Sequence, residues 1–213
     1  MKKIIILLLI FYAFLKLDAN AQTYTQSADS LLIHLNKSLI PTGVLYDRAW
    51  PIAALQNLNV FEPDTTNHAY FLEAYGEMLN SAYNQSGWFP TDTIVHRAYL
   101  VKTSIPVGLA FYTYNVIDTN AIQNNLIQMH SDSLYYDTPG RIVSPYNTIN
   151  TFVASPLIDS VNAHNWLQFS FPSSLFINKS SLTISSLKVD FNDGNGLTTV
   201  ALNSTYAVHY YQP

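Results

Sequence analysis

Hydrophobic side chains recur every three to four positions in two segments, and this period predicts helices. Residues 67–84 show the clearer pattern, with apolar and polar side chains on opposite faces: Phe71, Tyr75, Met78 and Ala82 against Glu73, Glu77, Asn80 and Asn84. Residues 23–38 repeat leucines at the same spacing, and Ser27 is suited to cap the first turn. We expect a short amphipathic helix there and a longer one over residues 67–84.

Other segments are rich in β-branched and aromatic residues, or alternate between apolar and polar, which predicts strands. Residues 105–117 predict one long strand or a pair of strands, and residues 166–171 predict a half-buried strand. Residues 93–102 are compatible with either element, and we favour a strand. Residues 119–138 stay open, with a short helix after Asn120 as one interpretation.

A hairpin is predicted close to the C-terminal end of the sequence. Asp193-Gly194-Asn195-Gly196 is a strong turn signal, because glycine and asparagine accept left-handed backbone. Strands are expected before it at residues 182–191, after it at residues 198–202, and again at residues 206–211.

These elements predict an α+β protein with two regions. A mixed helix and strand region is expected over residues 22–140, followed by an incomplete antiparallel β-sandwich over residues 149–213. Thr138-Pro139-Gly140 and Ser144-Pro145 mark the boundary, because proline and glycine break regular structure.

The first 21 residues have the three parts of a cleavable secretory signal peptide. Lys2 and Lys3 are followed by an apolar run of 12 residues, and Ala19-Asn20-Ala21 is a small-x-small cleavage site. The run is shorter than the roughly 20 apolar residues that a membrane span needs. We expect a secreted protein that begins at Gln22 and has no membrane span after cleavage.

Charge and cysteine content exclude several classes of function. Removing the signal peptide leaves 7 basic and 13 acidic residues, a net charge of −6 with neutral histidines. This acidity argues against nucleic acid and anionic membranes as partners. The chain has no cysteine, which excludes disulfides, a thiol nucleophile and thiolate-bound metals.

Val189-Asp190-Phe191-Asn192-Asp193-Gly194 resembles the strand and turn that mark PKD-type immunoglobulin-like domains, with Asn192 where that family has glycine. Val208-His209-Tyr210 resembles the penultimate strand of such a domain. The resemblance implies a β-sandwich over residues 149–213 whose last strand is missing, and therefore a fragment of a larger protein. Leu39-Ile40-Pro41-Thr42-Gly43 and Ile105-Pro106-Val107-Gly108 also resemble segments of exported Bacteroidota proteins.

Catalytic and metal sites are not indicated by any residue spacing. Glu73 and Glu77 could share acid–base work at their four-residue spacing, but they lie opposite the apolar face and should be solvated. None of the six histidines lies within four residues of another, and no nucleotide-binding motif is present. We therefore expect no catalytic residues, no metal and no cofactor.

Seven of the eleven aspartates are followed directly by serine or threonine. In five cases the third residue makes the triplet resemble the O-glycosylation acceptor of exported Bacteroidota proteins, which implies sugar at Ser30, Thr65, Thr93, Ser133 and Ser160. The alternative is that these pairs are ordinary turns and helix caps.

Aromatic side chains are the remaining candidates for ligand contact. Trp88 lies between Gly87 and Pro90 in a predicted loop, and Trp50 precedes Pro51. Exposed aromatic rings stack on sugars and anchor protein partners. We expect a secreted or cell-surface interaction module without catalysis, for adhesion or glycan binding, with a glycan or a cell-surface protein as partner. The alternative is an extracellular hydrolase acting on a polymer such as a polysaccharide.

Overall fold

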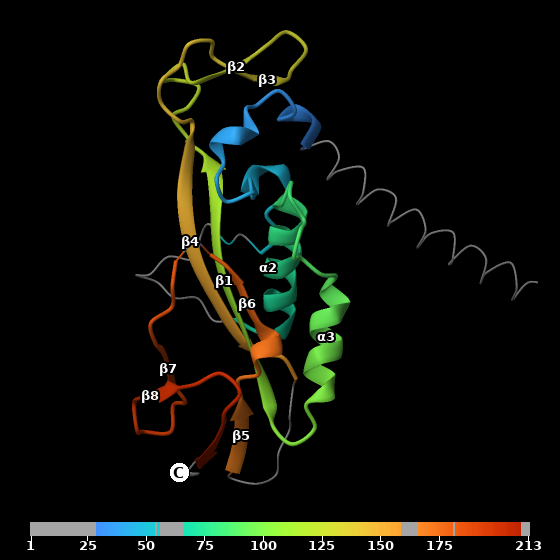
Figure 1. Ribbon diagram of the computed structural model, residues 1–213, viewed down its shortest axis with the longest axis vertical. Helices are drawn as coiled ribbons and strands as arrows, with labels where there is room; N and C mark the ends of the chain where they lie inside the picture. The colour runs from blue at the N-terminus through green and yellow to red at the C-terminus, as the bar shows by residue number, and fades with distance from the viewer. Residues whose placement is uncertain (1–28, 54, 56–65, 159–165, 181, 210–213) are drawn as a thin grey trace, which may run out of the picture.

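The protein is described by a computed structural model over residues 29–53, 55, 66–158, 166–180 and 182–209 (Figure 1). It has the expected α+β architecture, with a central mixed sheet, helices on one face and a small two-stranded sheet near each end. The predicted signal peptide and Ser27 lie outside the described residues. No described helix combines the length and the apolar character that crossing a membrane requires.

The centre of the sheet is one long strand, β1 (Ile105–Ile117), as the pattern over residues 105–117 predicted. It pairs along its length with β4 (Tyr146–Pro156) in antiparallel register, from Val107 opposite Pro156 to Ile117 opposite Tyr146. β1 is buried on both faces over most of its length, which explains its nearly continuous apolar sequence. This pair joins the two regions expected on either side of residues 138–148 in one sheet.

The other edge of β1 is covered by short segments in succession. β5 (Trp166–Ser170) pairs at Ile105 and Pro106, and β6 (Phe176–Lys179) pairs from Leu109 to Tyr112. Both run parallel to β1, so the central sheet is mixed. β9 (Thr205–His209) then adds to β5 in antiparallel fashion.

Two helices cover one face of this sheet (Figure 1). α2 (His68–Ser81) confirms the helix predicted over residues 67–84, and its Phe71, Tyr75 and Met78 are all buried. α3 (Thr91–Leu100) lies where a strand was favoured, so that prediction was wrong. Ile94 and Ala98, one turn apart, are its buried side chains, which makes a helix the better way to bury this segment.

The helix predicted over residues 23–38 was wrong in its second half. Helical backbone ends at Leu31, and a short 3-10 helix, η1 (Lys37–Leu39), follows. His34 forms an isolated bridge with Tyr136, and the side chain of Asn36 accepts a hydrogen bond from the Ser38 amide. These contacts compete with helical hydrogen bonds and therefore end the helix early. A second 3-10 helix, η2 (Tyr46–Arg48), precedes α2.

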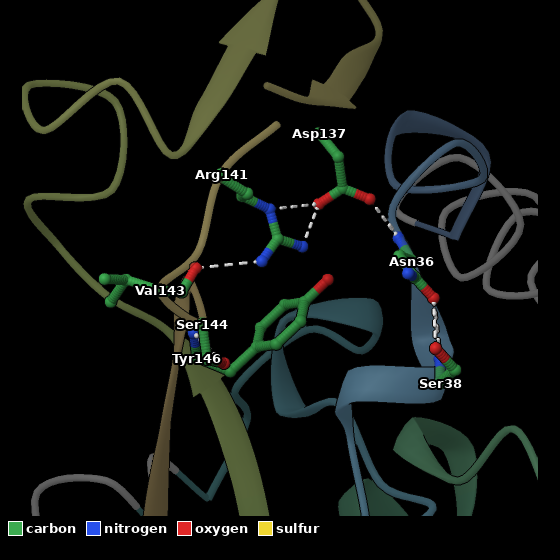
Figure 2. A network of polar contacts seen from close by, with 7 residues as sticks. All are labelled: Asn36, Ser38, Asp137, Arg141, Val143, Ser144 and Tyr146. Carbon is green, nitrogen blue, oxygen red and sulfur yellow. Dashed lines mark hydrogen bonds and ion pairs between the residues drawn. The ribbon is translucent and has the colours of Figure 1, made fainter. Parts of the chain in front are cut away.

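Residues 119–138, left open by the sequence, form turns and a small hairpin of β2 (Ile127–Met129) and β3 (Tyr135–Asp137). Figure 2 shows how polar contacts hold it. Arg141 binds the carboxylate of Asp137 through two nitrogens, and its third nitrogen donates to the carbonyl of Val143 at 2.9 Å. The other oxygen of Asp137 accepts a hydrogen bond from the amide of Asn36. The hairpin is thereby tied to the N-terminal segment.

The hairpin turn predicted at residues 193–196 is confirmed. β7 (Leu187–Asp190) and β8 (Leu197–Val200) pair antiparallel, and Asn192, Gly194 and Gly196 have φ of 55°, 85° and 72°. The first strand is shorter than the expected 182–191. A final 3-10 helix, η4 (Ser173–Leu175), precedes β6. Apolar side chains of β7, β8 and the N-terminal part of β1 form one cluster with side chains of β5 and β9.

Candidate functional site

A cleft of about 470 Å³ opens beside β1, within the size range of small-ligand sites. It lies along the edge of β1 opposite β4, between the segment that pairs with β6 and the next backbone contact on that edge. β6 pairs with this edge up to Tyr112, and the next contact is the bridge between Leu45 and Asn115. Thr113 lines the gap between these two contacts. The cleft therefore follows from the short length of β6, which leaves this stretch of edge open.

Trp88 provides the aromatic side of the cleft. Trp88 closes a turn in which its backbone amide donates a hydrogen bond of 3.1 Å to the carbonyl of Gln85. Gly87 supplies the left-handed backbone that this turn needs, with φ of 74°. The indole ring lies parallel to the Tyr112 ring at 6.3 Å between centroids and tilted against Tyr75 at 5.6 Å. These rings fix the orientation of Trp88 before any ligand binds.

Lys179, the last residue of β6, provides the only charge among the residues that line the cleft. Its ammonium donates to the carbonyl of Gly87 at 2.7 Å and lies 4.9 Å from the centre of the Trp88 ring. Partial burial lowers the pKa of this amine below its ordinary 10.5. The contact holds the Trp88 turn against β6, so the charge and the aromatic ring are placed together.

Uncharged polar groups complete the lining. The side chain of Asn84 accepts from the amide of Ser86 at 3.0 Å, an arrangement that leaves its amide hydrogens without a partner among the described residues. Thr113 and Ser180 lie 2.6 Å apart through their hydroxyls. Thr42, Ser86 and Thr148 add further hydroxyls. This combination of one fixed indole ring, one side-chain amide and several hydroxyl groups suits a ligand that is itself rich in hydroxyls.

Of the two tryptophans singled out from the sequence, Trp88 is in the cleft and Trp50 is not. Trp50 is 58% exposed in the segment after η2. Among the predicted glycosylation residues, Ser30 and Ser133 are exposed and Thr93 is half-buried in the first turn of α3. Ser133 lies in the turn between β2 and β3, while Thr65 and Ser160 lie outside the described residues.

The two glutamates of α2 have different surroundings. Glu73 is exposed, as expected, but Glu77 is buried, so the expectation that it is solvated was wrong. It accepts hydrogen bonds from the hydroxyl of Tyr46 and from the amide of Ala53. The segment that contains η2 covers this flank of α2, an arrangement that the helical pattern alone does not reveal.

The described residues contain no group of three or more histidines, aspartates or glutamates placed to hold a metal ion. None of the residues lining the cleft is acidic. No family model, curated protein or solved structure matches this chain.

Lys179 is the site residue that sequence reasoning missed. It lies 92 positions after Gly87, in a strand that the pattern did not predict. Trp88 could be found because glycine and proline frame it in the sequence. Lys179 reaches Trp88 because β6 pairs with β1, and no local sequence pattern predicts that pairing.

Proposed function

We propose that this protein is a secreted, non-catalytic binding module that holds a glycan in the cleft beside Trp88. The observation that carries the proposal is a preoriented indole ring inside a cleft lined by amide, hydroxyl and ammonium groups. Sugar rings present C–H faces to aromatic side chains and hydroxyls to polar ones. A rigid site loses little conformational entropy on binding, which favours affinity.

The test is binding of purified residues 22–213 to an immobilised panel of neutral, uronate-containing and sulfated oligosaccharides. We expect the bound sugars to be lost with Trp88→Ala, and Trp50→Ala to bind as the parent does, because Trp50 lies outside the cleft. Asn84→Ala is a second cleft variant, chosen because Asn84 is exposed and its loss should leave the fold intact. Loss with Trp50→Ala alone, or no binding to any sugar, would overturn the proposal.

The same experiment addresses the alternative of a hydrolase. Bound oligosaccharides recovered after incubation should keep their length, since the described residues that line the cleft include no carboxyl group for acid–base work. Shortened products would favour the hydrolase instead.

Secretion is part of this proposal and rests on the signal peptide pattern of residues 1–21. Expression in a bacterial host should yield a periplasmic or extracellular product whose first residue is Gln22, as read by mass spectrometry of the intact chain. A cytosolic product that retains Met1 would contradict it. The same mass spectrum tests the proposed O-glycosylation, of which exposed Ser133 is the best-supported acceptor.

We also propose that residues 149–213 belong to the immunoglobulin-like type suggested by the resemblance to PKD domains. Support comes from the edge of the central sheet, where β9 pairs with β5, and from the small sheet of β7 with β8, which share an apolar cluster containing Phe171 and Val200. Asn192 adopts the left-handed backbone that the family's glycine would adopt there. An experimental structure in which these two sheets do not pack together would contradict this assignment.

A further inference from the structure

We propose that the glycan held beside Trp88 carries an anionic group, a carboxylate or a sulfate, and that Lys179 binds it. This inference rests on the proposed function and specifies the class of sugar. The geometry that carries it is an ammonium group at the wall of the cleft, fixed by Gly87 and by the Trp88 ring, in a lining without any other charge.

Lys179 lacks a countercharge, unlike several other charged residues that the structure describes. Ion pairs link Asp29 to Arg48 and Lys37, and Asp137 to Arg141. Within the part of the chain that the structure describes, Lys179 has no carboxylate within ion-pair distance. A partly desolvated cation without an anion is unfavourable, and an anionic ligand would supply the missing charge.

The ammonium group of Lys179 keeps hydrogen-bonding capacity for a ligand. It has three donors, of which one is used by the carbonyl of Gly87. A carboxylate or sulfate oxygen can accept another while the sugar ring contacts Trp88. Charge-assisted hydrogen bonds are roughly twice as strong as neutral ones, so this contact should decide between acidic and neutral sugars.

The rest of the protein is acidic. The chain without its signal peptide has a net charge of −6, which repels anions at long range. A cationic cleft on an acidic protein is therefore a local exception. We expect binding to depend on the contact with Lys179 rather than on general attraction, so that removing other basic residues has little effect.

The experiment compares matched sugars and matched variants by titration calorimetry. An oligogalacturonate is compared with its neutral methyl ester, and a sulfated galacto-oligosaccharide with its desulfated form. We expect at least one acidic member to bind about tenfold or more tightly than its neutral counterpart, a preference that Lys179→Gln abolishes. Lys179→Arg should retain much of it. Lys188→Gln, which removes an exposed lysine of β7 that does not line the cleft, should leave it unchanged.

The outcomes separate the two proposals. Equal binding of acidic and neutral sugars that still requires Trp88 overturns this inference and leaves the proposed function standing. Absence of binding by every sugar overturns both. Preference for one acidic class over the other identifies the anion as carboxylate or sulfate. If Lys179→Gln and Lys188→Gln lose the preference for acidic sugars equally, the attraction is long-range only, and the role of Lys179 is overturned. Thermal unfolding of Lys179→Gln checks that the variant is folded.

Discussion

The hydroxyl of Tyr46 donates a hydrogen bond of 2.9 Å to Oε2 of Glu77, and both side chains are buried. The same hydroxyl accepts from the amide of Leu55 at 3.0 Å, and the second carboxyl oxygen accepts from the amide of Ala53. Burial, together with the neighbouring carboxyl group, raises the pKa of the Tyr46 hydroxyl above its ordinary 10.0 and keeps it protonated. Glu77 therefore joins α2 to the segment that crosses it.

Glu77→Ala should lower the free energy of unfolding by about 2–4 kcal/mol, because the Tyr46 hydroxyl and the Ala53 amide lose their buried acceptor. Urea denaturation followed by circular dichroism measures this loss. Glu73→Ala on the same helix is the matched control and should change stability by less than about 0.5 kcal/mol, since Glu73 is exposed. Equal losses in the two variants would show that the buried hydrogen bonds are not the cause.

Gly108→Ala should destabilise the protein by about 1–3 kcal/mol, because there is no room for a methyl group between β1 and α2. An added Cβ would lie 2.8 Å from side-chain atoms of Phe71 and Leu157. Gly76→Ala within α2 meets no atom within 4 Å and should stabilise the protein by about 0.5–1 kcal/mol through helix propensity. Thermal unfolding of the two variants should shift in opposite directions, and a shift in the same direction would contradict the close approach.

The periodicity of the sequence predicted the helices and strands that bury a regular face. It failed where contacts with distant segments determine the secondary structure. β1 matches its predicted range because a strand buried on both faces is apolar throughout. α3 was missed because Thr91, Thr93 and Ile94 are β-branched and favour strands, although Asp92 in the first turn and the pair Ile94 and Ala98 favour a helix.

The residues of the candidate site also fall into those that the local sequence could predict and those that it could not. Trp88 could be predicted because its loop residues are adjacent in sequence. Lys179 and the buried state of Glu77 depend on segments that pack from elsewhere in the chain, β6 in one case and η2 in the other. Sequence periodicity describes one element at a time and has no information about which segment will cover its flank.

Arg141→Met should loosen the β2–β3 hairpin, because Asp137 loses both hydrogen bonds from the guanidinium group (Figure 2). The Arg141 side chain is only 8% exposed, so the loss should be about 2 kcal/mol. Hydrogen exchange measures it, with the Asn36 amide as reporter since it donates to the same carboxylate. Arg141→Lys keeps the charge without the fork geometry and should show an intermediate rate. Unchanged exchange at Asn36 in both variants would contradict this coupling.

The ion pair between Asp29 and Arg48 should stabilise the fold only above acidic pH. Hydrogen bonds from Arg48, at 2.6 and 2.9 Å, hold the pKa of Asp29 below its ordinary 3.8. A carboxyl group whose pKa is lower in the folded state contributes stability at pH values above 3.8, and that contribution is lost as the pH falls through the folded pKa. The Asp29 side chain is 40% exposed, so the contribution at neutral pH should be no more than about 1 kcal/mol.

A double-mutant cycle of Asp29→Asn and Arg48→Met, measured by urea unfolding between about pH 7 and pH 2, tests this dependence. The coupling energy should be present at neutral pH and should fall as the pH drops through the lowered folded-state pKa of Asp29. The cycle cancels the separate contact of Arg48 with the carbonyl of Ser81 at 3.4 Å, because Asp29→Asn leaves that contact in place. A coupling energy that stays constant down to about pH 2 would contradict a stabilising role for the charge of Asp29.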